Sequence, residues 1–164
     1  MESHSITSSV IQILVLLLCS AFFSATETAF TSLNRIRIKN KADAGNPSAK
    51  RVLALEQNYD NLLSTILVGN NLVNIASTAV ATVLFMNLYG QYGATISTIV
   101  TTVIVLIFGE ITPKSLAKEH PETFASFAAP IINLLRIILT PINWIFAQWK
   151  KLLSVIFKTE VVPS

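Results

Sequence analysis

The sequence predicts an all-α membrane protein with three transmembrane helices and a juxtamembrane helix pair on the cytoplasmic side. Three observations predict this class. Of the 164 residues, 52% are hydrophobic and only 13% are charged. The mean hydropathy of +0.59 is typical of integral membrane proteins rather than of soluble domains. The charged residues gather between long apolar stretches, which indicates a chain that crosses the bilayer several times.

The first transmembrane helix is expected at about residues 8–33. Its apolar core is similar to that of a signal peptide, but no Lys or Arg precedes it and the first basic residue is Arg35. A signal peptide needs a basic region before its apolar core. We therefore interpret this segment as a retained membrane helix.

A basic segment over residues 34–58 separates the first helix from the second. Gly, Asn and Pro at 45–47 predict two short helices joined by a turn. The second transmembrane helix is expected at about residues 59–88 and the third at about 94–117, joined by a short loop without Lys or Arg. Because basic loops stay in the cytoplasm, the chain is predicted to lie in the cell membrane with its N-terminus outside and its C-terminus cytoplasmic.

Residues 124–149 form a fourth apolar stretch that contains Arg136, two prolines and two tryptophans, within a helical region expected at about 121–158. A crossing here would place the lysines near its end outside, against the positive-inside rule. We expect a bent helix pair in the inner interface, where aromatic and basic anchors are common. A genuine fourth span is the alternative.

Several classes of site are disfavoured by composition. Cys19 is the sole cysteine, and His4 and His120 are the only histidines, which leaves little for a zinc centre. No His-Glu-x-x-His motif and no pair of intramembrane aspartates occurs, so we expect no enzyme activity. The basic segment is interpreted as a topology determinant that contacts anionic lipids, and we expect no nucleic-acid partner.

Glu110 is the polar residue with the strongest functional signal. It follows an apolar run that must extend past it to span the bilayer, so the carboxylate lies at membrane depth. Such residues are costly and mark ion or substrate pathways. Pro113 is expected to break the helix, because it lacks the N–H that would bond the carbonyl of Gly109, and to leave a free carbonyl beside the acid. The alternative is a structural carboxylate paired with Lys114.

Two other helices offer oxygen atoms at a similar distance from the presumed cytoplasmic edge. Asn70 and Asn74 are four residues apart, so they share a helix face. Ser24 begins a hydroxyl-containing stretch that can loosen the first helix. Counted at about 1.5 Å per residue, Ser24, Asn70 and Glu110 lie at one depth. The alternatives are interhelical packing bonds for the asparagines and ordinary helix hydroxyls for the serine.

Three motifs together resemble the transmembrane domain of the CNNM/CorC magnesium transporters. They are Phe-Phe-Ser-Ala-Thr-Glu-Thr-Ala-Phe at 22–30, Gly-Asn-Asn-Leu-Val-Asn at 69–74 and Gly-Glu-Ile-Thr-Pro-Lys at 109–114. They occur in the order and spacing of that family. The resemblance implies a homodimer that carries a dehydrated Mg²⁺ in each protomer. It also implies cytosolic CBS domains in a full-length protein, which residues 1–164 do not include.

Carried over by motif, the resemblance implies metal ligands at Ser24, Asn70, Asn74, Gly109 and Glu110. The function it implies is Mg²⁺ transport, in the direction of export and coupled to Na⁺. The alternative is a Mg²⁺-sensing or membrane-anchoring interaction module that does not itself transport.

Overall fold

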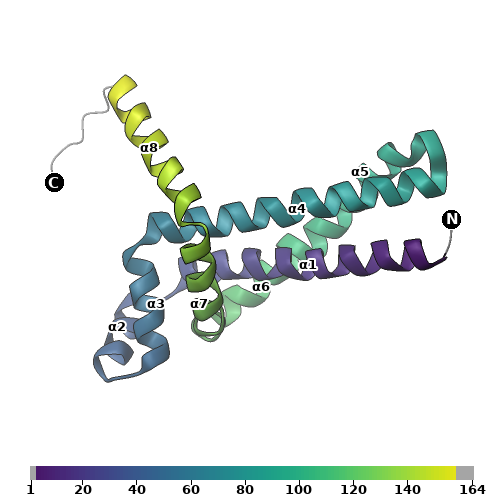
Figure 1. Ribbon diagram of the computed structural model, residues 1–164. Coiled ribbons are helices and arrows are strands. Elements are labelled where there is room, and N and C mark those ends of the chain that lie inside the picture. The colour runs from purple at the N-terminus through teal and green to yellow at the C-terminus, as the bar shows by residue number, and fades with distance from the viewer. Residues whose placement is uncertain (1–2, 158–164) are drawn as a thin grey trace.

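The computed structural model describes residues 3–157, and every regular element in that range is helical (Figure 1). The predicted all-α membrane fold is therefore confirmed. In chain order the elements are α1 (Ser3–Ser32), α2 (Arg35–Asp43), α3 (Pro47–Gln57), α4 (Tyr59–Tyr89), the short 3-10 turn η1 (Gly90–Tyr92), α5 (Gly93–Ile104), the π-helical segment η2 (Val105–Ile111), α6 (Thr112–Glu119), α7 (Pro121–Ile138) and α8 (Thr140–Ile156).

Two continuous helical segments, Ser5–Ser32 and Tyr59–Glu119, are long and apolar enough to cross a membrane. The second has 61 residues and reverses direction at η1, so α4 is followed by the returning leg α5–η2–α6 (Figure 1). In this leg α5 packs against α4, whereas η2 and α6 pack against α1. Together with α1, α4 and this returning leg form the three predicted membrane legs. In the most apolar 18-residue stretch of each segment only 11% is buried inside the protein. The apolar side chains of these segments therefore face outward, where lipid would cover them.

The hydroxyls of α1 do not interrupt it, contrary to the expectation that they would loosen this helix. α1 is continuous from Ser3 to Ser32. The hydroxyl of Thr26 donates to the carbonyl of Phe22 at 2.6 Å, four residues back, and so stays within the helix. Back-bonding of this kind satisfies the hydroxyl without breaking the backbone hydrogen bonds.

The predicted pair of short helices is present as α2 and α3, at the end of the bundle opposite η1 (Figure 1). Both begin at an asparagine cap: Asn34 accepts from the backbone N–H of Arg37, and Asn46 from that of Ala49. Such caps satisfy N–H groups that the first turn leaves unpaired. Gly45 makes the turn between the helices with φ of 97°, a conformation that favours glycine.

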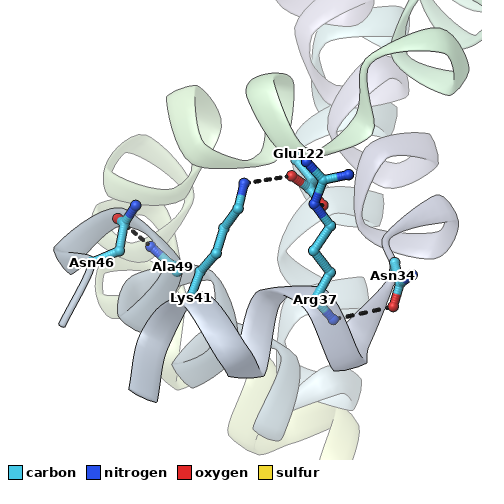
Figure 2. A network of polar contacts seen from close by, with 6 residues as sticks. All are labelled: Asn34, Arg37, Lys41, Asn46, Ala49 and Glu122. Atoms are coloured by element: carbon cyan, nitrogen blue, oxygen red, sulfur yellow. Dashed lines mark hydrogen bonds and ion pairs between the residues drawn. The ribbon is translucent and has the colours of Figure 1, made fainter. Parts of the chain in front are cut away.

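Ion pairs attach α2 to the first turn of α7. Arg37 and Lys41 extend from α2 to Glu122, with Nε–Oε1 and Nζ–Oε2 distances of 3.2 and 2.9 Å (Figure 2). Glu122 also lies near the positive end of the α7 dipole, which favours a carboxylate there. The ion pairs therefore fix α2 to α7, against which α3 also packs.

Glu56 of α3 is the buried member of another ion pair, in which its Oε2 lies 3.0 Å from Nε of Arg35. Burial raises the pKa of Glu56 above its ordinary value of 4.5, although Arg35 partly opposes the rise. Because the folded pKa is the higher one, ionisation of Glu56 favours the unfolded chain. The contribution of protonated Glu56 to the stability of the folded state is complete below the pKa that Glu56 has in the unfolded chain. It is lost as pH rises through the higher pKa of the folded state.

Replacing Glu56 by Gln should therefore flatten the pH dependence of thermal unfolding above pH 4.5, the ordinary pKa of this side chain. The amide keeps the shape of the side chain but cannot ionise, so we expect a small gain in stability at neutral pH. Melting temperatures measured across this range test the prediction. Asp43→Asn, at an exposed position of α2, is the matched control. An unchanged pH profile in Glu56→Gln would contradict the assignment.

The last two helices form the predicted bent pair, because α7 and α8 meet at 72°. α7 buries one face, which includes Ala125, Ala129 and Ile132, against the bundle, whereas most of α8 is exposed and leaves the bundle at an angle (Figure 1). Two polar contacts join α8 to α4, namely Asn143 Nδ2 to Thr65 Oγ1 at 3.2 Å and Lys150 Nζ to Asp60 Oδ2 at 3.2 Å. α7 and α8 are long and apolar enough to form a membrane span only when they are taken together.

Candidate metal site between three membrane legs

Asn70 and Asn74 form the centre of a polar cluster inside the bundle. They lie one turn apart on α4, and the Nδ2 of Asn74 is 3.5 Å from the Oδ1 of Asn70. The hydroxyl of Ser20 on α1 lies 2.7 Å from Oδ1 of Asn74 and 3.3 Å from Oδ1 of Asn70. Because the hydroxyl has one proton, the shorter contact is the stronger donation. Both amide oxygens therefore point toward α1.

Glu110 brings the third leg into the same cluster. The Nδ2 of Asn70 donates to Oε1 of Glu110 at 3.4 Å. The other carboxylate oxygen, Oε2, lies 3.3 Å from Nζ of Lys114, one turn further along. The ion pair that the sequence left open as an alternative is thus present, and the carboxylate contacts an amide and an ammonium at once.

The backbone around Glu110 is wider than an α-helix. Residues Val105–Ile111 are π-helical, and the N–H of Thr112 bonds the carbonyl of Ile107, five residues back. Pro113 follows in the first turn of α6. The proline does not break the leg as expected, since the π-helical segment leads directly into α6, which continues to Glu119. π-helical turns of this kind often occur at functional sites.

Gly109 lets the widened turn approach α1. It is buried, and a Cβ placed on it would lie 2.9 Å from Oγ of Ser20. A side chain here would press on the hydroxyl that donates to Asn74. The glycine therefore keeps η2 and α1 close enough for Ser20, Asn74 and Glu110 to belong to one site.

Four of the five predicted ligand residues are brought together: Asn70, Asn74, Gly109 and Glu110. On α1 the residue in hydrogen-bond contact is Ser20, which the sequence interpretation missed. Ser24, the predicted ligand, is one turn away and fully buried, and its hydroxyl has no hydrogen-bond partner among residues 3–157. The sequence did contain a signal for Ser20, because it lies four residues before Ser24 and therefore on the same face of α1.

The donor atoms of this cluster suit a hard cation. The amide oxygens of Asn70 and Asn74 lie beside the Ser20 hydroxyl, and the carboxylate of Glu110 lies beside the amide nitrogen of Asn70. All of these oxygens are of the kind that Mg²⁺ prefers. Among the described residues no group of three or more His, Cys, Asp or Glu side chains could hold a metal. The local charge therefore comes from Glu110 alone, and Lys114 opposes it.

Lys114 should compete with any cation at Glu110. We expect Lys114→Met to strengthen Mg²⁺ binding by a few-fold, because partly exposed ion pairs are worth about 1 kcal/mol or less. Isothermal titration of the folded chain in detergent measures this change. Lys118→Met, one turn further along α6 and outside the described ion pairs, should leave the affinity unchanged. Weaker binding by Lys114→Met would instead indicate that the ammonium supports the site.

Comparison with known protein families shows which family the chain belongs to. The model of the cyclin M transmembrane N-terminal domain matches residues 11–162. The matched range contains every residue of the polar cluster. The chain belongs to the cyclin M transmembrane domain family.

Relatives of this cyclin M domain include membrane proteins of bacteria. The UPF0053 inner membrane protein YfjD of Escherichia coli K12 is 41% identical over 147 residues, which cover 88% of this chain and 34% of that protein. A UPF0053 protein of Haemophilus influenzae is 39% identical over 92% of the chain and 36% of its own length. The polyamine export protein of E. coli K12 is 30% identical over 94% of the chain and 38% of its own length.

The cyclin M domain described here spans about a third of the length of these relatives. Its long apolar helices and its family identify it as a multi-pass membrane domain. The orientation in the membrane stays a prediction from the basic segment.

Proposed function

We propose that this domain moves Mg²⁺ across the membrane, in the direction of export and coupled to Na⁺. The observation that carries the proposal is the hydrogen-bonded cluster of Ser20, Asn70, Asn74 and Glu110, contributed by three different membrane legs. A cation held between legs rather than on one of them can be released by moving one leg relative to the others. That is the geometric requirement for alternating access.

The donor set supports a small divalent cation as the cargo. Mg²⁺ takes near-octahedral oxygen coordination at roughly 2.0–2.1 Å and loses water reluctantly. Asn70, Asn74, Glu110 and the unpartnered hydroxyl of Ser24 would replace part of that water, with the Gly109 carbonyl as a further ligand. The single carboxylate keeps binding weak enough for release.

Polyamine is the competing cargo, because one relative is named a polyamine export protein. A polyamine carries ammonium groups separated by methylene chains and needs acidic groups that are spread out. The described cluster is compact and has one carboxylate. It therefore favours an inorganic cation. An excess of putrescine should leave Mg²⁺ flux unchanged, and inhibition by putrescine would support the polyamine.

The alternative from another class is a module that senses Mg²⁺ or anchors a larger protein without transport. Reconstitution of the chain in liposomes that contain a Mg²⁺-sensitive dye distinguishes the two. We expect Mg²⁺ flux that responds to an imposed Na⁺ gradient. Binding by titration without flux under any gradient would support the sensor and refute transport.

The rest of the expected assembly belongs to the same proposal. It comprises a homodimer through the membrane legs, contacts with lipids, cytosolic CBS domains in a full-length protein, and an N-terminus on the outside. Cross-linking of single-cysteine variants in membranes tests the dimer. The Cys19→Ser background is suitable for this, since Cys19 is the only native thiol.

A further inference from the structure

Two arginines from different helices line one small cavity on the side of α3 and α7. Arg51 of α3 and Arg136 of α7 share it with Ala54, Leu55 and Asn133. Its volume is about 90 Å³. A water molecule occupies about 30 Å³ in the liquid, so the cavity has room for a compact polyatomic group and not for an acyl chain.

The two cations of this cavity are not neutralised by an ion pair within residues 3–157. Arg35, Arg37 and Lys41 each have a carboxylate partner, whereas neither Arg51 nor Arg136 forms an ion pair with any described residue. The acid nearest in sequence on α3, Glu56, is bound to Arg35. The cavity therefore combines two positive charges without a neutralising acid.

Arg136 also has an unused hydrogen-bond donor. Its Nη2 donates to Oδ1 of Asn133 at 2.8 Å, which orients the guanidinium. Its Nε is buried and has no partner among residues 3–157. A buried N–H of a charged group without an acceptor is costly, so Arg136, which lines the cavity, would gain from an added acceptor that reaches this atom.

We propose that this cavity binds the phosphate group of an anionic membrane lipid. Guanidinium groups match phosphate oxygens in pairs, and two of them from different helices can contact one phosphate from two sides. The proposal is independent of the metal cluster, and it adds a lipid site to the domain.

The surroundings favour a lipid over a free phosphate. On α7 the residues beside Arg136 include Leu134, Ile137 and Ile138, which are large, apolar and exposed. Trp144 on α8 is exposed as well, and tryptophan is enriched where headgroups meet acyl chains. A basic pocket beside an apolar helix face is the arrangement that holds lipid headgroups at membrane surfaces. The acyl chains would lie against α7 and α8.

Thermal unfolding of the whole chain in detergent, with dioctanoyl phosphatidylglycerol as the probe, tests the proposal. We expect a saturable rise in melting temperature, which dioctanoylglycerol, lacking the phosphate, does not produce. Arg51→Gln and Arg136→Gln should each raise the half-saturating lipid concentration about tenfold, as loss of one charged hydrogen-bonding partner predicts. Arg51 is exposed, so its variant is expected to fold even if the Arg136 variant does not.

Lys50→Gln and Lys151→Gln are the matched controls, because both remove an exposed charge outside the cavity. They should keep the wild-type response. An equal shift in the arginine and lysine variants would overturn the proposal, since it would indicate attraction by net charge alone. Inorganic phosphate acting at the same concentration as the lipid would overturn the assignment to a lipid.

Discussion

Replacing Glu110 by Gln is expected to abolish Mg²⁺ flux and to weaken Mg²⁺ binding by at least about tenfold. Gln keeps the shape of the side chain and an oxygen that can accept from Nδ2 of Asn70, which lies 3.4 Å away in the structure. It removes the only negative charge of the cluster. The variant therefore separates the charge of Glu110 from its packing, which Ala would not do.

Glu119→Gln is the control for this experiment. It makes the same chemical change on the same leg, at an exposed position at the end of α6. Liposome flux and isothermal titration of both variants, after each is shown to be folded, give the comparison. If Glu110→Gln transports Mg²⁺ as well as the control, the metal site lies elsewhere.

The largest loss of stability is expected from Gly93→Ala, at about 2 kcal/mol or more. Gly93 is buried at the start of α5, where the chain turns back onto α4. A Cβ here would lie 2.5 Å from both Cα and N of Met86 and 2.6 Å from the carbonyl carbon of Phe85. These are backbone atoms of α4, so no side-chain rotation can relieve the clash. The two legs must separate at the turn.

Ala94→Ser is the matched control for this variant, because it adds one heavy atom at the exposed neighbouring position. Thermal unfolding in detergent and protease sensitivity near η1 measure the effect. We expect earlier unfolding and faster cleavage for Gly93→Ala only. Equal melting temperatures for the two variants would contradict the close packing of the turn.

Much of the fold could be predicted from local signals. Apolar length predicted the membrane legs, and the Gly-Asn-Pro sequence at 45–47 predicted the turn between α2 and α3. The bend between α7 and α8 was expected from the prolines and from the charges around them. These features depend on residues that are close together in the chain, which is why the amino-acid sequence alone was enough to predict them.

The details of the cluster depended on packing between helices and could not be predicted in the same way. Counting depth from Arg35 selected Ser24, but the rotation and offset of α1 against α4 place Ser20 beside Asn74. Pro113 was expected to break its helix, and η2 widens instead, because a wide turn satisfies most backbone groups. Both outcomes are set by contacts between residues far apart in the chain.

The two polar contacts between α8 and α4 have a consequence for the polar cluster. α8 leaves the bundle at the 72° bend after α7. Its attachments are on α4, through Thr65 and Asp60. Thr65 lies five residues before Asn70, so α8 is attached to the same helix that supplies both asparagines of the cluster.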